Sequence, residues 1–347
     1  MVPGKMQEGP PFLRSKRNPV YLVAEIGGNH EGSFDKAVEM LNLALQAGVD
    51  AVKFQILRGD RLVSPLESPD RNQHFKRFEL EQRHFETLAK ICRQNDTAFM
   101  ASVWDLKSLQ WVDPLVEMHK VGSGDLTAFP ILRALAETGK PILLATGLST
   151  LTEVKRTVDY IASCNPSYLE EKKLILLQCT ASYPNPDSDA NLRAIQTLQQ
   201  HFKLPIGYSD HTFGLEAPYM AYLLGAEVIE FHFTDHRENQ TFRDHQISAT
   251  AEEVREFIER LKRAAVLLGS PVKKPAPSEI ERGHLQSFRR SVYAARDLTA
   301  GQVLTAEDLT VLRPEHGIPA WRFDQLPGRK LNKDLKQFAA IREEDFA

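Results

Sequence analysis

The sequence predicts a (β/α)8 TIM barrel followed by a small C-terminal domain of short strands and turns. Eight short apolar runs alternate with amphipathic stretches, and polar or charged residues follow nearly every run. A doubly wound open sheet is the competing architecture, but its polar residues would cluster at one switch point. The stretch GSPVKKPAP at residues 269–277 marks the end of the barrel pattern.

The barrel pattern opens with a strand, a helix and a second strand. Residues 21–24 form an apolar run that leads to Glu25, and a glycine-rich loop follows. Apolar residues then recur at helical spacing over residues 34–45, Gly48 ends this helix, and residues 49–54 form the second strand. Because parallel sheets present their chemistry at the carboxyl ends of strands, we expect the residues that end these runs at the site.

The same alternation continues along the chain. Further strands are expected at residues 98–102, 118–121, 142–145, 174–179, 205–208 and 228–233. Helices are expected at residues 83–94, 151–162, 192–202, 215–224 and 251–268.

The rest of the chain divides around this barrel, which we place at residues 19–270. Residues 1–18 are basic and proline-rich and lack the apolar stretch of a signal peptide, so a flexible arm is expected there. Residues 271–287 are expected to form a linker. Residues 288–347 alternate short apolar runs with turn-like sequences, which predicts a small second domain.

Composition excludes several classes of partner. The chain of 347 residues has a formal net charge of −3, which gives no case for nucleic acid or a membrane surface. No apolar run is long enough to span a bilayer. The three cysteines are scattered and lack C-x-x-C spacing, which is typical of reduced thiols in a cytoplasmic protein.

Two histidines at adjacent strand ends predict a metal site. His211 follows the seventh run in GYSDHTFG, and His232 lies in the eighth run in IEFHFT. Neighbouring strands are about 4.8 Å apart, so both imidazoles can reach one divalent ion, with water or substrate oxygens at its open positions. A single histidine is more often a hydrogen-bonded core or loop residue, and the pairing favours the metal. Mixed histidine and oxygen ligation suits manganese, zinc, cobalt or magnesium.

Two lysines predict an anionic substrate. Lys53 ends the second run and Lys120 the fourth, and even-numbered strands share layers of a barrel interior. Two ammonium groups in a dry cavity need anions, which phosphate or carboxylate would supply. Pairing with structural acids is the alternative for each lysine. Ser123 in KVGSGD and Thr146 in LLATGLS add hydroxyls near the same rim.

Acidic residues complete the expected site. Glu25 could orient a water or hold a proton, or else form a salt bridge to Lys53. Asp125 could accept from substrate hydroxyls, or cap a helix. Asp244 lies in a long polar loop at residues 236–250, and loops of this length over a barrel are often lids, with a solvated loop as the alternative.

Seven motifs in order resemble those of the sialic acid (N-acetylneuraminate) synthase family. They are AEIGGNHEG, AVKFQ, KVGSGD, QCTASYPNP, GYSDHT, EFHFT and FRRSVYAARDLTAGQVLTAEDL. The resemblance implies a (β/α)8 barrel with a C-terminal antifreeze-like (SAF) domain, in a homodimer that swaps this domain onto the partner barrel. It implies condensation of phosphoenolpyruvate with an N-acylated aldose, such as N-acetylmannosamine, with release of phosphate.

The resemblance also implies roles for individual residues. Glu25 is similar to the family's catalytic acid, and His211 and His232 to its metal ligands. Phosphoenolpyruvate would contact Lys53, Lys120, Ser123, Thr146 and Ser209. The sugar would contact Gln55, Asp125, Tyr183, Asp244, Phe288 and Arg313, the last of these reaching the partner's site.

Four positions depart from the family's pattern: Gln178, Ala145, Ala181 and Phe231. Loss of hydrogen-bonding groups near the acceptor would suit a different aldose. Two rival functions are a Schiff-base aldolase with Lys53 or Lys120 as nucleophile, and a non-catalytic sugar-binding homologue. The paired histidines argue against the aldolase, since an imine route does not use a metal.

Overall fold

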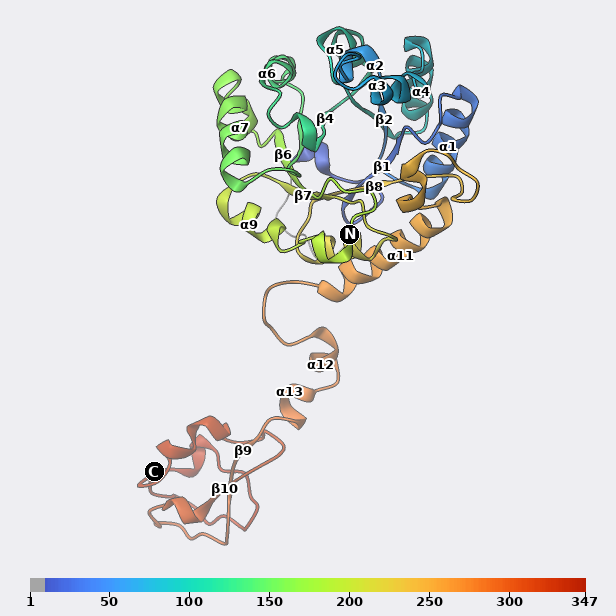
Figure 1. Ribbon diagram of the computed structural model, residues 1–347. Coiled ribbons are helices and arrows are strands. Elements are labelled where there is room, and N and C mark those ends of the chain that lie inside the picture. Colours follow the sequence, from blue (N-terminus) through green and yellow to red (C-terminus); the bar gives the residue numbers. More distant parts are fainter. Residues whose placement is uncertain (1–9) are drawn as a thin grey trace. The chain divides into compact units, whose positions relative to one another are not determined.

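The computed structural model describes residues 10–347 as two compact units, which divide after Gly269 (Figure 1). In the first unit, eight parallel strands close into a barrel in sequence order, as predicted. The strands are β1 (Tyr21–Gly27), β2 (Ala51–Gln55), β3 (Ala98–Ser102), β4 (His119–Val121), β5 (Ile142–Ala145), β6 (Leu174–Cys179), β7 (Ile206–Ser209) and β8 (Val228–His232).

Helices surround this ring of strands (Figure 1). They are α1 (Phe34–Ala47), α4 (Gln82–Gln94), α5 (Leu106–Val112), α6 (Phe129–Thr138), α7 (Leu151–Cys164), α9 (Ala194–His201), α10 (Glu216–Leu223) and α11 (Ala251–Leu268). Capping follows the sequence: the Ser33 side chain accepts from the Lys36 amide at the start of α1, and Gly48 ends the helix at φ 90°. Among the helices of residues 10–347, none combines the length and apolar character needed to cross a bilayer.

Alternation along each strand separates two apolar layers. On β1, Leu22 and Ala24 pack into the layer between strands and helices, whereas Tyr21 and Val23 pack into the barrel interior. Glu25, the next residue in the inward register, therefore faces the interior above Val23. Toward the amino-terminal ends of the strands the barrel interior is filled by apolar side chains. The inward polar side chains lie at the carboxyl ends of the strands.

The expected arm before the barrel is described only from residue 10, and residues 1–9 lie outside the described residues. A 3-10 turn at Pro11–Leu13 places Leu13 in the inner apolar cluster with Tyr21. Ser15 donates to the Asp50 carboxylate at 2.5 Å. Residues 10–18 thus pack against the amino-terminal end of the barrel.

One excursion was not predicted from the sequence. Between β2 and α4 the chain forms two short helices, α2 (Gly59–Leu62) and α3 (Pro69–Lys76). A separate short helix, α8 (Ser167–Glu170), follows barrel helix α7. Asn72 is buried in α3 and donates to the Val63 carbonyl at 2.8 Å, which joins the two short helices. This excursion contributes one wall of the cavity described below.

The second unit has its own core. It contains α12 (Pro277–Glu281), α13 (His284–Ser287) and the antiparallel pair β9 (Ser291–Ala294) and β10 (Leu309–Leu312). Val292, Leu304, Leu326 and Ile341 are among its buried apolar residues. This is the small domain of short strands and turns that the sequence predicts.

Candidate active site

A cavity of about 530 Å³ opens at the carboxyl ends of the barrel strands. Most residues predicted from the sequence line it. They are Glu25, Lys53, Gln55, Lys120, Ser123, Asp125, Tyr183, Ser209, His211, His232 and Asp244.

Four buried charges form a compact network at the base of the cavity. The Lys53 ammonium lies 2.7 Å from Glu25 Oε2 and 3.7 Å from Glu230 Oε1. Lys120 lies 3.0 Å from the same Glu230 oxygen, which also accepts from Ser209 at 3.1 Å. The two lysines therefore share one carboxylate, as expected for cations from even-numbered strands that point into the same layer.

The two carboxyl groups of this network differ in proton affinity. Burial raises the pKa of Glu25 despite the opposing effect of Lys53. Burial opposes ionisation of Glu230 as well, but Lys120 and Lys53 together lower its pKa to about 2. The two neighbouring carboxyl groups therefore differ in how readily they hold a proton, and Glu25 holds it more readily than Glu230. Gln55 orients that group by donating to Glu25 Oε1 at 2.9 Å.

The two histidines lie side by side, with ring centroids 5.2 Å apart. His211 Nδ1 is 2.7 Å from the Thr180 carbonyl, which can only accept, so Nδ1 carries a proton and Nε2 can bind a ligand when the ring is neutral. Burial lowers the His211 pKa, but Cys179 and the Thr180 carbonyl raise it overall. His232 Nδ1 is buried without a hydrogen-bond partner, and burial together with His211 and Lys53 holds the His232 pKa well below its usual value. A neutral ring with an unshared nitrogen fits a metal ligand.

Among residues 10–347, His211 and His232 are the pair that we expect to share an ion. Within residues 10–347, no group of three histidine, cysteine, aspartate or glutamate side chains is arranged to hold an ion. An ion bound by His211 and His232 would therefore keep most of its positions for water or substrate oxygens, as in an open catalytic site.

The rim is aromatic and charged. The Tyr183 ring lies 4.0 Å from the His211 ring, and the Arg243 guanidinium lies 4.2 Å above the Tyr183 ring. Arg243 also pairs with Asp244 at 2.9 Å, and Asp244 Oδ2 is 3.8 Å from His232 Nδ1. Burial raises the pKa of Asp125 across the cavity.

Three predicted residues lie elsewhere. Thr146 does not line the cavity, because its hydroxyl donates to the Leu177 carbonyl at 2.9 Å. Phe288 and Arg313 belong to the second unit, where the Arg313 guanidinium lies 5.5 Å from the Phe288 ring centre.

The four departures from the family pattern also divide by location. Ala145 and Ala181 line the cavity, so they change its wall. Gln178 and Phe231 do not, because their neighbours Cys179 and His232 take the inward register. Gln178 donates to the Ala190 carbonyl at 3.4 Å, and Phe231 packs among the helices. Gln178 and Phe231 therefore do not form part of the cavity wall.

Sequence reasoning missed many of the cavity residues, and among the chemically reactive or charged ones are Glu230, Cys179 and Arg243. The inward position of Glu230 could have been predicted, because Glu230 lies two residues before His232 on the same strand and must face the same way. Cys179 follows from the same rule once β6 is placed. Arg243 carried no signal, since a polar loop sequence does not reveal which side chain turns inward.

The architecture and site define a class of protein: an enzyme-like barrel with a charged, metal-compatible cavity at its carboxyl end, joined to a small β-rich domain. Family models match in the same order, the NeuB family over residues 40–273 and the SAF domain over residues 289–347. The chain belongs to the NeuB family of sialic, legionaminic and pseudaminic acid synthases.

Relatives are similar over nearly the whole chain. The N,N'-diacetyllegionaminic acid synthase of Legionella pneumophila is 34% identical over 91% of this chain and 91% of its own length. The N-acetylneuraminate-9-phosphate synthase of Mus musculus is 31% identical over 94% of this chain and 93% of its own length. The crystal structure of N-acetylneuraminic acid (sialic acid) synthetase from Leptospira borgpetersenii aligns with TM-score 0.70 and 33% identity, over 77% of this chain and 91% of that one.

Proposed function

We propose that this chain condenses phosphoenolpyruvate with an N-acylated aldose, releases phosphate and forms a nonulosonic acid. One observation carries the proposal: the paired lysines and the paired histidines open into a single cavity. The lysines offer ammonium protons to a phosphate and a carboxylate, and the histidines offer nitrogens to a divalent ion. The relatives' names, which include singly and doubly N-acetylated products, support an N-acylated acceptor.

In the proposed reaction, Lys53 and Lys120 hold phosphoenolpyruvate at the base, with Ser209 and Ser123 beside them. The Ser123 oxygen accepts from the Gly147 amide at 3.1 Å, and its O–H can donate to Cys179 or to a bound phosphate. The aldose lies above, between Tyr183, Asp125 and Asp244. Holding both reactants in one cavity lowers the entropic part of the barrier.

The bonds change as follows. C3 of phosphoenolpyruvate attacks the aldehyde carbon, and the aldehyde oxygen takes a proton to become a hydroxyl. Water then adds to the cationic C2, and loss of phosphate from that carbon leaves the ketone. Glu25 handles the proton of the water, since its carboxyl group lies in the cavity 2.7 Å from the Lys53 ammonium and burial raises its pKa. A divalent ion bound by His211 and His232 would supply Lewis acidity toward the aldehyde oxygen.

The ion pairs argue against the rival aldolase. A Schiff-base lysine must lose its proton to attack a carbonyl. Burial favours the neutral form of Lys53, but Glu230 and Glu25 raise its pKa overall, so Lys53 keeps its proton. Lys53 is therefore suited to bind anions as an ammonium group, and Lys120 lies beside it on the same Glu230 carboxylate.

A phosphate-release assay tests the proposal. Phosphoenolpyruvate is offered with aldoses that carry one or two N-acetyl groups, each with and without a terminal phosphate. We expect phosphate release only when an acceptor is present, loss of release after chelation, and recovery with Mn²⁺. Full activity after rigorous metal removal would refute the metal's role, and a borohydride-trapped lysine adduct would favour the aldolase.

A further inference from the structure

The segment of residues 241–244, between β8 and α11, supplies three residues to the cavity. They are Phe242, Arg243 and Asp244. Phe242 packs edge-on against Phe78 at 4.7 Å between ring centres, and Arg243 and Asp244 form the rim contacts to Tyr183 and His232. The placement of this segment therefore shapes the acceptor side of the cavity.

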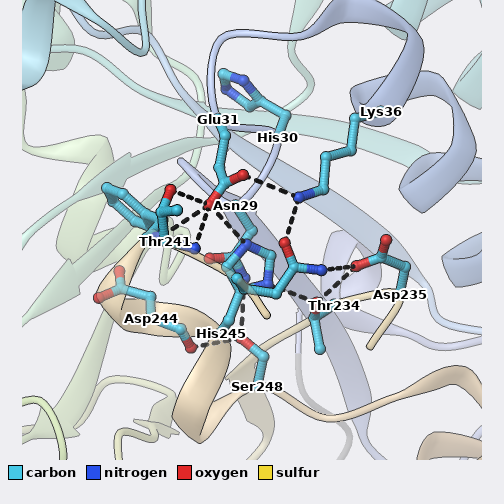
Figure 2. A network of polar contacts seen from close by, with 12 residues as sticks. Asn29, His30, Glu31, Lys36, Thr234, Asp235, Thr241, Asp244, His245 and Ser248 are labelled. Atoms are coloured by element: carbon cyan, nitrogen blue, oxygen red, sulfur yellow. Dashed lines mark hydrogen bonds and ion pairs between the residues drawn. The ribbon is translucent and has the colours of Figure 1, made fainter. Parts of the chain in front are cut away.

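Glu31, in the loop after β1, fastens the start of this segment. Its Oε1 accepts from the Thr241 amide at 2.8 Å, the Thr241 hydroxyl at 2.7 Å and the Phe242 amide at 2.8 Å (Figure 2). Its Oε2 accepts from Lys36 at 3.2 Å, and Lys36 also donates to Gln240 at 2.6 Å. Burial opposes the charge, but the bonds from Thr241 and Phe242 lower the Glu31 pKa to about 2, so the side chain is a carboxylate at neutral pH.

Asn29, two residues earlier, fastens the end of the same segment. Its buried side-chain amide donates to the Phe233 carbonyl and to the Ser248 hydroxyl, both at 2.9 Å. Ser248 in turn donates to the Asp244 carbonyl at 2.7 Å (Figure 2). The loop after β1 thus holds residues 241–244 at both ends. This segment is therefore fixed to the barrel, in contrast to the lid considered from the sequence.

Glu31 makes its bonds from an unfavourable backbone conformation. Its φ is 51°, in the left-handed region that favours glycine, while its neighbour Gly32 lies at φ 80°. A glutamate in this position costs conformational energy that the four hydrogen bonds to its carboxylate offset. The stabilising contribution of Glu31 therefore comes from the hydrogen bonds to its carboxylate and not from its backbone conformation.

We propose that Glu31 is a positioning residue for the sugar acceptor. It acts through the amides of Thr241 and Phe242, which place Phe242, Arg243 and Asp244 against the cavity. This inference rests on the proposed synthase function. Phosphoenolpyruvate is held by Lys53 and Lys120 on β2 and β4, so its binding does not depend on Glu31.

The test compares Glu31→Ala with the conservative Glu31→Gln in the full-length protein. We expect Glu31→Ala to raise the KM of the acceptor about tenfold or more, since small displacements of positioning groups are costly, while the KM of phosphoenolpyruvate stays within about twofold. Glu31→Gln keeps an oxygen for the same three donors, so it should recover most of the acceptor affinity. Equal effects of Glu31→Ala on both substrates, or none on either, would overturn the proposal.

A matched control comes from Asp50, at the opposite end of the barrel. Its carboxylate also accepts from a backbone amide, that of Leu22 at 2.9 Å, and from the Ser15 hydroxyl. Asp50→Ala removes bonds of the same kind far from the cavity, so it should leave the KM of the acceptor unchanged. A matching rise in Asp50→Ala would show that general loosening of the barrel explains the effect, and would overturn the proposal.

Hydrogen exchange followed by mass spectrometry measures the protection of the Thr241 and Phe242 amides by Glu31 without any substrate. Glu31→Ala should speed exchange in the peptide that contains the Thr241 and Phe242 amides, and leave peptides from β2 and β4 unchanged. Unchanged exchange there would overturn the role of Glu31. If Glu31→Ala does not fold, Thr241→Val, which deletes one of the three donors to Oε1, provides the same comparison. Absence of synthase activity in the wild type would instead refute the proposed function, and the exchange result would still decide the role of Glu31.

Discussion

Glu230 supplies the negative charge that allows two lysines to lie together in a nearly dry interior. Its side chain is only 5% exposed, and its Oε1 is shared by Lys120 and Lys53. Burying charge is expensive, and removing one partner leaves the others uncompensated. Removal of one member of the network should therefore destabilise the fold.

Glu230→Gln should lower the free energy of unfolding by about 3 kcal/mol, because two ammonium groups would lose their shared carboxylate. Urea denaturation measures this change. The control is Glu259→Gln, since Glu259 is largely exposed and pairs with Lys262 on the surface, where such pairs contribute little. Equal stability of the two variants would contradict the structural role given to Glu230.

His30 provides a prediction of pH dependence. It is fully buried, and burial together with Lys36 lowers its pKa to about 4. A histidine with a lowered pKa stabilises the fold fully above its unfolded pKa of about 6.5, and this contribution is lost as pH falls from about 6.5 to about 4.

His30→Gln should therefore remove part of the acid sensitivity. Between pH 6.5 and 4 we expect the unfolding free energy of the wild type to fall more steeply than that of the variant, by up to about 1.4 kcal/mol per pH unit. His201→Gln, an exposed position on α9, should follow the wild type. Parallel curves for wild type and His30→Gln would show that His30 is not the titrating group.

At the residue scale, the sequence could predict which charged and polar side chains lie at the strand ends and point inward. The alternation of strands placed Lys53, Lys120 and His232 inward, and the cavity contains all three. It could not predict pairing: the structure joins Lys53 to Glu25, the alternative left open at the outset. Thr146 was misplaced because a hydroxyl at a strand end serves the backbone as readily as a ligand.

At the scale of elements, the segment before β1 closes the amino-terminal end of the barrel interior. Leu13 packs with Tyr21, Val23 and other inward side chains from several strands. Nothing in the basic, proline-rich sequence around Leu13 distinguishes a packed segment from a loose one. Helical periodicity likewise predicted α7 and α11 well, but the short helices α2 and α3 lack it and were missed.

Leu13→Ala should cost about 2 to 3 kcal/mol of unfolding free energy, as expected for a buried leucine whose site cannot fully collapse. Thermal or urea unfolding would measure it. Leu66→Ala is the matched control, since Leu66 is 89% exposed, and it should change stability by less than about 0.5 kcal/mol. A loss in both variants, or in neither, would contradict the packing of the segment.

At the scale of the whole molecule, the chain combines a barrel with a second unit that has its own core. The units divide after Gly269, where a run of prolines and lysines begins, and the expected linker at residues 271–287 contains α12 and α13 within the second unit. The identity of the second unit as a SAF domain came from motif resemblance and is matched by the family model. Short strands and turns alone would not have distinguished it from other small β-rich domains.

Arg313 is the cation of the second unit that the family resemblance links to the sugar. We propose a homodimer in which the SAF domain of one copy offers Arg313 to the sugar bound in its partner's barrel. Arg313→Ala should then raise the KM of the acceptor about tenfold or more and leave that of phosphoenolpyruvate nearly unchanged, because a charge-assisted hydrogen bond is lost on the sugar alone. Steady-state kinetics with each substrate varied in turn measures this split.

Lys336→Ala is the control for Arg313, since Lys336 is an exposed cation in the same unit. It should change neither KM. If Arg313→Ala weakened both substrates equally, its role toward the sugar would be wrong.

The most direct test of the central claim is mass spectrometry of the product formed from phosphoenolpyruvate and an N-acylated aldose. The proposed bond changes predict one new acid whose mass is the sum of the aldose and pyruvic acid, with one phosphate released per molecule formed. Recovery of free pyruvate beside the intact aldose would contradict condensation in this cavity.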